Sequence, residues 1–194
     1  NLAPRAAFTW NATKKTTVRG GYGIFYDWYE SNLLEQTIRL DGSHQIETIV
    51  QNPGFPVSDA GGTRLPASIT RAANLGQPII HQASFGLERP LTSWLDFRTD
   101  YMWTRGYDTL RSINVNAPIN GVRPDPTVGN ITEIQSSGKR ASDRATVALN
   151  ARYQPRRIFT MVMYQFGSQR NVADSALSLP SDSNNPDQDW GAAA

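Results

Sequence analysis

Hydrophobic and polar side chains alternate over short stretches of this chain, and the stretches come in pairs. Each pair is separated by a tight turn, which is the pattern of a β-hairpin. The pattern predicts an all-β, antiparallel fold of about six strands in three hairpins. The expected hairpins span about 4–26, 81–103 and 144–166, with turns over 11–15, 89–93 and 154–157.

The alternation is clearest over residues 94–103, where one face is apolar and the other carries Asp96, Arg98 and Asp100. This is the pattern of a transmembrane β-strand, with apolar side chains toward lipid and polar side chains toward a wet lumen. The residues expected to face lipid are Leu95, Phe97, Phe85, Leu149 and Val162. The alternative is a secreted β-sandwich, in which the apolar face packs on a second sheet and the charges face bulk water.

Long polar connections follow each hairpin, at about 27–80, 104–143 and 167–194. Compact soluble domains rarely contain structureless connections longer than about 12–15 residues. Outer-membrane β-barrels combine short periplasmic turns with long extracellular loops. Within the first connection we expect one short helix in 27–40, after a capping pair Asp27–Glu30, and the Pro- and Gly-rich stretches 51–78 and 114–138 to be irregular.

Aromatic residues lie near the ends of the expected strands, which is typical of the two girdles that flank a membrane-spanning β-sheet. Six strands are too few to close such a barrel, because single-chain barrels begin at about eight. We therefore expect a segment of a larger barrel, with 4–10 and 158–166 as open edges. These edges would pair with strands outside this sequence or with another copy of the chain.

Composition excludes several other classes. The net charge is +2 with scattered Lys and Arg, which does not indicate a nucleic-acid-binding protein. The mean hydropathy is −0.47, and no apolar run approaches the length of a transmembrane helix. The chain contains no cysteine, so disulfides and thiolate metal sites are excluded.

Candidate chemistry is sparse. His44 and His81 are the only histidines, and they do not have a metal-binding spacing. The glycine-rich stretch 19–23 lacks the Lys-Ser/Thr of a phosphate loop, so its glycines are expected to relieve crowding in a strand. Asp182, Asp187 and Asp189 are candidate calcium ligands, although their spacing differs from an EF-hand. We therefore predict no catalytic residues, no cofactor and no enzymatic activity.

Several stretches resemble the barrel of TonB-dependent outer-membrane receptors, in particular the Oar-like group that carries a carboxypeptidase-regulatory-like domain. They are VRGGYGIFYD (18–27), NPGFP (52–56), QASFGLERPL (82–91), YMWTRGYDTLRSINVNAP (101–118), VRPDPTVGNITEIQSSG (122–138) and DWG (189–191). The resemblance covers nearly the whole chain. No plug domain, TonB box or terminal aromatic strand is recognisable in it, so we expect a middle-to-late barrel segment.

The resemblance implies a barrel of about 22 strands with a plug inside, energised by a TonB-type protein. It implies a location in the outer membrane of a Gram-negative cell, with the long loops extracellular. The partners that it implies are outer-membrane lipid, the plug and the rest of the barrel. The expected function is uptake of a large or scarce solute, and no ligand-binding residue can be transferred. The alternative is a surface structural, adhesion or filament-forming protein, whose loops or open edges bind other proteins or further copies of the chain.

Overall fold

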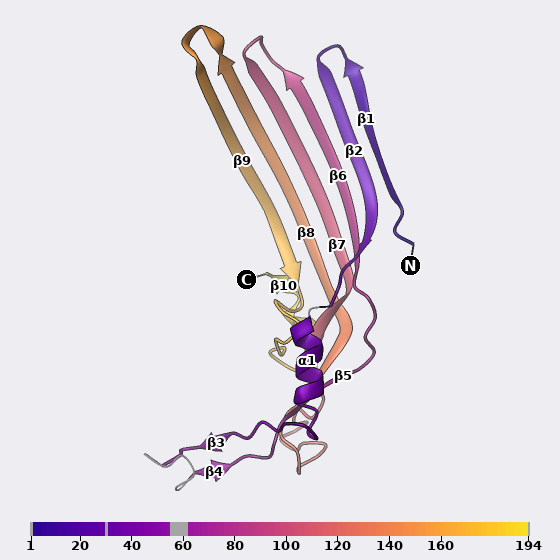
Figure 1. Cartoon of the computed structure of the whole chain (residues 1–194), viewed down its shortest axis with the longest axis vertical. Helices are drawn as coiled ribbons and strands as arrows, with labels where there is room; N and C mark the ends of the chain where they lie inside the picture. Colours follow the sequence, from indigo (N-terminus) through magenta and orange to yellow (C-terminus); the bar gives the residue numbers. More distant parts are fainter. Residues whose placement is uncertain (1, 30, 55–61, 194) are drawn as a thin grey trace. The chain divides into compact units, whose positions relative to one another are not determined.

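The computed structural model describes residues 2–29, 31–54 and 62–193, and its regular structure is mostly antiparallel β-sheet (Figure 1). The strands are β1 (Arg5–Thr13), β2 (Thr16–Tyr26), β3 (Val50–Gln51), β4 (Thr63–Arg64), β5 (Ile69–Ala72), β6 (Ile79–Pro90), β7 (Leu95–Asn114), β8 (Ile131–Tyr153), β9 (Ile158–Asn171) and β10 (Gly191–Ala192). One α-helix, α1 (Ser31–Arg39), and two 3₁₀ turns, η1 (Gln154–Arg156) and η2 (Pro186–Asp189), complete the described elements.

The chain divides into two compact units, and unit 1 contains the hairpins. It consists of Asn1–Asp27, Ile79–Tyr107 and Lys139–Arg170. Its strands follow the order β1-β2-β6-β7-β8-β9, with the three tight turns at one end of the sheet (Figure 1). All three predicted hairpins are confirmed, and the last turn ends at Arg157, whose φ of 53° is left-handed.

The sheet of unit 1 is open. Among the described strands β1 pairs only with β2, and none joins β1 to β9. The terminal hairpins therefore do not close a small barrel, which agrees with the expectation of a segment from a larger one.

The strands of the second and third hairpins are longer than the sequence pattern predicted. We expected a loop over about 104–143, but β7 continues to Asn114 and β8 begins at Ile131. The polar side chains of these extensions, such as Arg111 and Ser112, obscured the strand pattern because their partners lie far away in the sequence. The connection that lacks strand structure is 115–130.

Unit 2 consists of Trp28–Pro78, Asp108–Gly138 and Asn171–Ala194. The predicted helix is present as α1, whereas Glu30 of the expected capping pair lies outside the described residues. The stretch expected to be irregular contains β5, which pairs in parallel with the start of β8 from Ile69↔Ile131 onward. Leu33, Ile134 and Val172 are its buried apolar side chains.

Candidate recognition surfaces

One face of unit 1 is apolar and exposed. Backbone register places Phe8, Gly20, Phe85 and Tyr101 in one row across β1, β2, β6 and β7. Phe8 and Phe85 are each 53% exposed, a level that a soluble protein would normally avoid for neighbouring aromatic rings. This surface is called the outer face below.

The residues predicted to face lipid follow this row. Leu95 and Phe97 lie on the outer face with Tyr101, because side chains alternate along β7. Tyr101 donates a hydrogen bond of 2.7 Å to Asp143 on β8, so Leu149, six residues further along β8, lies on the same face. Val162 on β9 is 61% exposed.

The opposite face, called the inner face, is polar. Arg19 on β2 and Glu88 on β6 form an ion pair of 3.1 Å, and Arg98 and Asp100 form a second of 2.7 Å along β7. Glu88 and Arg98 are directly opposed in the register of β6 and β7. These four side chains place alternating charges along the expected lumen wall, as the sequence pattern indicated. They line a wet surface rather than a core.

Glycines allow close approach on both faces. A Cβ at Gly20 would lie 2.5 Å from the ring of Phe8, so the ring covers the glycine on the outer face. A Cβ at Gly86 would lie 2.6 Å from Oδ1 of Asp100 on the inner face. The prediction that the glycine-rich stretch relieves crowding therefore agrees with the geometry at Gly20.

Aromatic contacts lie toward both ends of the outer face. Trp94 and Tyr153 meet edge to face near the hairpin turns, with ring centroids 6.4 Å apart. At the other end of unit 1, His81 contacts Tyr107 edge to face at 5.6 Å and forms a 2.6 Å hydrogen bond through Nδ1 with the hydroxyl of Tyr22. This arrangement matches two girdles at the membrane boundaries.

The polar connections form an ordered body in unit 2, and Asn116 lies at its centre. Asn116 is 1% exposed, and its side-chain Nδ2 donates to the carbonyls of Asp125, Val128 and Gly129 at 2.8–3.0 Å. Its Oδ1 accepts a 2.8 Å bond from the backbone N–H of Asp125. One side chain thus joins the start of the connection between β7 and β8 to residues near its end.

The C-terminal segment is tied to the same body. Ser112 donates a 2.6 Å hydrogen bond to the carbonyl of Ala176, and Asn184 donates to the carbonyl of Pro118 at 3.1 Å. Buried Arg111 forms an ion pair of 3.0 Å with Asp187. Segments more than sixty residues apart in sequence are therefore joined by polar contacts.

The first connection reaches this body through β5 and the residues before it. Arg71 and Glu133 form an ion pair of 2.7 Å across the parallel strands. Ser68 accepts a 3.1 Å bond from the backbone N–H of Asn130. All three long connections therefore contribute to one surface.

The candidate calcium ligands are not brought together. Asp187 pairs with Arg111, and Asp182 accepts a 2.8 Å bond from the backbone N–H of Asn184. Asp189 accepts bonds from the hydroxyl and the backbone N–H of Ser181, which lower its pKa. Within the part of the chain that the structure describes, no group of three or more His, Cys, Asp or Glu side chains could hold a metal ion.

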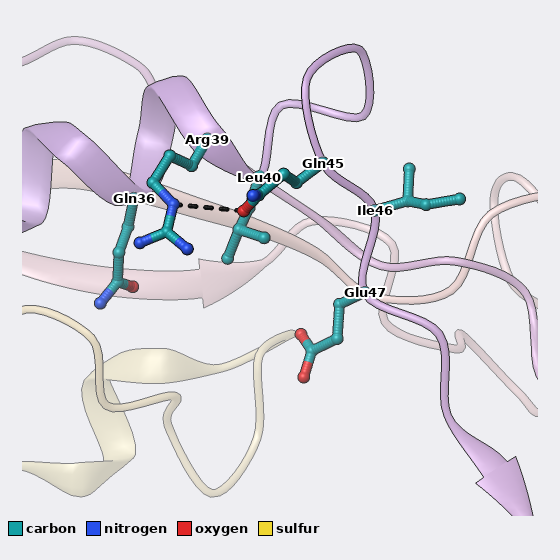
Figure 2. Close-up of a pocket in the computed structure, with 6 residues that line it drawn as sticks. All are labelled: Gln36, Arg39, Leu40, Gln45, Ile46 and Glu47. Carbon is teal, nitrogen blue, oxygen red and sulfur yellow. Dashed lines mark hydrogen bonds between the residues drawn. The ribbon is translucent and has the colours of Figure 1, made fainter. Parts of the chain in front are cut away.

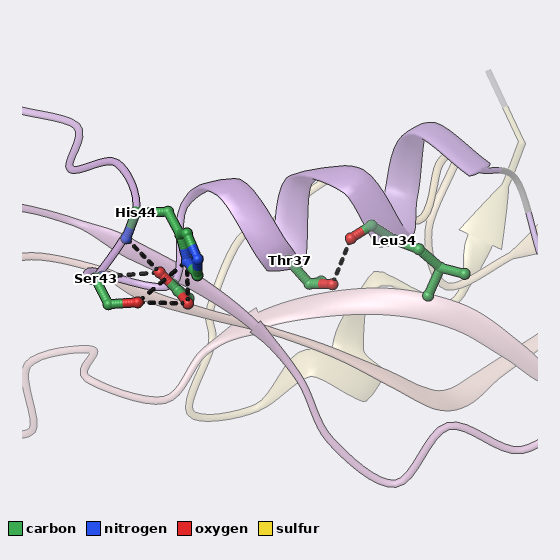
Figure 3. Close-up of polar contacts among 5 residues, drawn as sticks. Leu34, Thr37, Ser43 and His44 are labelled. Carbon is green, nitrogen blue, oxygen red and sulfur yellow. Dashed lines mark hydrogen bonds and ion pairs between the residues drawn. The ribbon is translucent and has the colours of Figure 1, made fainter.

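His44 belongs to a tight turn (Figure 3). Oδ1 of Asp41 accepts the backbone N–H groups of His44 and Ser43 at 3.0 and 2.8 Å, and these bonds lower the pKa of Asp41. The hydroxyl of Ser43 and the carboxylate of Asp41 both contact Nδ1 of His44. In a catalytic triad the hydroxyl and the carboxylate contact opposite nitrogens of the histidine ring. These three residues therefore do not have the geometry of a triad, and their hydrogen bonds stabilise a turn.

An open pocket of about 790 Å³ lies beside this turn (Figure 2). It is lined by Gln36, Arg39, Leu40, Gln45, Ile46 and Glu47. Nε of Arg39 donates to Oε1 of Gln45 at 3.2 Å, and Nη1 forms a 3.0 Å ion pair with Glu35. The pocket combines amide, charged and aliphatic side chains, which suits a polar solute with apolar parts.

The sequence pattern gave no indication of Arg111 or Asn116 as residues that organise the surface. The only local signal was the pair of asparagines at 114 and 116 before Pro118, which indicates a turn. Their partners lie in distant segments, so spacing alone could not reveal them.

Comparison with known proteins identifies the architecture. A family model described as an outer membrane beta barrel domain matches residues 1–194. The chain belongs to this outer membrane β-barrel domain family. The prediction of an antiparallel barrel segment in the outer membrane is thereby confirmed, and lipid is its environment. None of the described helices is long and apolar enough to cross a membrane.

A solved structure shares the fold. The outer membrane transporter YddB from Escherichia coli is similar with a TM-score of 0.64 and 16% sequence identity. The similarity covers 89% of this chain and 20% of the transporter, so the chain spans about a fifth of that protein's length. A search of the curated proteins finds no match.

Proposed function

We propose that this barrel segment belongs to a TonB-dependent receptor of the Oar-like group, which takes up a large or scarce solute across the outer membrane. The outer face contacts lipid, the inner face lines the lumen beside the plug, and unit 2 is the extracellular capture surface. The family match and the fold shared with an outer membrane transporter support the barrel part of this proposal. The sequence resemblance described above supports the receptor group.

The observation that carries the proposal is the ordered polar body of unit 2. A loop that serves only as a connection does not need a fully buried asparagine, yet Asn116 is 1% exposed, and Arg111 at the adjoining end of β7 is 7% exposed. Ordering these segments during folding costs conformational entropy. A surface that is already ordered loses little further entropy when it binds a solute, so its affinity for that solute is higher. The pocket at Gln36–Glu47 lies on this same unit.

An uptake assay on the full-length gene tests the function. Cells that express the gene, with and without the energising partner, are supplied with labelled oligosaccharides, peptides and metal chelates. We expect accumulation of one class only when the partner is present. A matched Asn116→Ala variant should reach the membrane in equal amount and lose most of the accumulation, because the capture surface is disordered.

Energy-independent behaviour with no solute phenotype would contradict the transport proposal. It would favour the surface structural or adhesion role, in which the open edges of β1 and β9 or the loops bind proteins. Cell aggregation or binding to immobilised copies of the receptor distinguishes that role.

We also propose that the chain has no enzymatic activity. The sequence contains only two histidines, one of them in a hydrogen-bonded turn and the other on the outer face. Turnover of any substrate that is abolished by replacing Asp182, Asp187 or Asp189 would overturn this.

A further inference from the structure

The open pocket of unit 2 is built by one stretch of chain, which runs from the last turn of α1 through the turn that follows the helix. Gln36 and Arg39 come from the helix, and Glu47 comes from the segment after the turn. The side chains of these three residues extend to the same side (Figure 2). The pocket volume of about 790 Å³ falls in the usual range for small-ligand sites, which is about 300–1,000 Å³.

Both walls of the pocket are tied to the same part of the chain. The backbone N–H of Thr70 on β5 donates to the carbonyl of Leu40 at 2.7 Å. The backbone N–H of Ser68, just before β5, donates to the carbonyl of Glu47 at 3.0 Å. The carboxylate of Asp41 closes the turn between the two walls. The pocket is therefore preformed, and a ligand pays little for ordering it.

One wall presents a cation with a fixed orientation. Nε of Arg39 donates to Oε1 of Gln45 at 3.2 Å, and Nη1 forms a 3.0 Å ion pair with Glu35. Nη2 makes no such contact within the part of the chain that the structure describes, and 55% of the side chain is exposed. Arg39 can therefore donate from Nη2 to a carboxylate of a ligand, which is a charge-assisted hydrogen bond.

The other wall presents an anion beside aliphatic surface. No ion pair or side-chain hydrogen bond joins the carboxylate of Glu47 or the amide of Gln36 to another described residue. Glu47 is exposed, and its neighbour Ile46 is 61% exposed. A ligand with a positive group can pair with this carboxylate, and its apolar part gains hydrophobic stabilisation by covering Ile46.

We propose that this pocket binds a short peptide by its two ends. Arg39 binds the terminal carboxylate and Glu47 binds the terminal ammonium group. Leu40 and Ile46 contact an aliphatic side chain between the ends. The inference rests on the proposed function, because it takes unit 2 as the capture surface and names the class of solute that is captured.

Charge complementarity favours a peptide over the other classes of solute. A neutral oligosaccharide supplies neither of the two charges that the walls can pair with. A metal chelate that carries only negative charge would be repelled by the carboxylate of Glu47. A peptide with free ends supplies one charge of each sign.

Titration calorimetry of the full-length protein in detergent tests the site without a transport step. The probe is the tripeptide alanyl-leucyl-alanine at about pH 6.5, where its amino group is charged because the ordinary pKa of that group is about 7.7–8.0. We expect the N-acetylated peptide and the C-terminal amide each to bind about tenfold more weakly than the free peptide, since a hydrogen bond to a charged group contributes about a factor of ten. A neutral trisaccharide should not compete.

Variants of the two walls assign each end of the peptide. Arg39→Gln should weaken binding of the free peptide about tenfold and leave binding of the C-terminal amide unchanged. Glu47→Gln should weaken binding of the free peptide by a similar factor and leave binding of the N-acetylated peptide unchanged. The matched control is Arg64→Gln, which removes one positive charge from an exposed side chain of the same unit outside the pocket. The control should bind all three peptides as the unmodified protein does.

Four results would overturn the proposal. They are no binding of the free peptide, equal affinity for the free and the doubly blocked peptide, displacement of the peptide by the trisaccharide, and an equal loss for all three peptides in both wall variants. Uptake of another solute class without peptide binding would overturn the peptide site and leave the transport proposal intact. Peptide binding without energised uptake would support the site and contradict transport.

Discussion

The guanidinium of Arg111 and the carboxylate of Asp187 lie 3.0 Å apart, although their side chains are 9% and 63% exposed. The buried cation on β7 thus reaches the surface through a partner from the C-terminal segment. Its Nε also donates to the hydroxyl of Ser137 at 2.9 Å. Arg111 therefore connects β7 and β8 to a segment that has little strand structure of its own.

Replacing Arg111 with Met should loosen the C-terminal segment and leave the hairpins intact. The variant loses charge-assisted hydrogen bonds, and we expect local opening to become easier by about 1–3 kcal/mol. Hydrogen exchange of residues 176–187 measures this. Asp187→Asn keeps an acceptor and should have a smaller effect. Unchanged protection in Arg111→Met would show that the ion pair does not hold the segment.

Asn116→Ala should destabilise the connection between β7 and β8 by about 3 kcal/mol, because a buried N–H and three carbonyls lose their partner. Limited proteolysis within 115–130 measures the loss. Asn184→Ala, which removes one exposed hydrogen bond to Pro118, is the matched control and should change cleavage little. Equal cleavage of the two variants would contradict the central role of Asn116.

Gly20→Val should destabilise the pairing of β1 and β2 by about 1–3 kcal/mol, since the new side chain collides with the ring of Phe8. In a Phe8→Ala background the same change should cost much less. A double-mutant cycle from denaturant unfolding in detergent measures the coupling. Additive effects of the two substitutions on the free energy of unfolding would mean that the ring of Phe8 and the residue at position 20 are not coupled.

Acid should release the turn that Asp189 closes. The hydroxyl and then the backbone N–H of Ser181 lower the pKa of Asp189. A carboxyl group with a lowered pKa stabilises the folded state above its unfolded value of about 3.9, and this contribution is lost as pH falls through the folded pKa. Hydrogen exchange of residues 181–189 should therefore show constant protection from neutral pH to about 4 and a loss below it. Asp189→Asn should be less protected at neutral pH and should lack the loss of protection in acid. An identical loss in this variant would show that a group other than Asp189 causes it.

Brominated lipids should quench the fluorescence of Trp94 and Trp103 but not that of Trp28 and Trp190. Trp103 lies on strand β7 and Trp94 directly precedes that strand, both in unit 1, and the others belong to unit 2, which we place outside the membrane. Proteins that retain one tryptophan each measure this directly. Strong quenching of Trp28 would instead place part of unit 2 in the bilayer.

The sequence by itself determined the hairpins and their two faces. Alternation over 94–103, short turns and aromatic strand ends are local features, because side chains of a strand alternate whatever it pairs with. The same reasoning located the helix α1 and the lipid-facing positions such as Phe85 and Phe97.

Only the tertiary structure decided how far the strands extend and what the long connections do. Residues 104–114 and 131–143 look polar in sequence, but distant partners satisfy their side chains, as Asp187 does for Arg111. Likewise, Asp182, Asp187 and Asp189 are close in sequence, yet each is engaged by a different group. A polar side chain specifies structure only together with its partner, and partners from separate segments meet only in the folded chain.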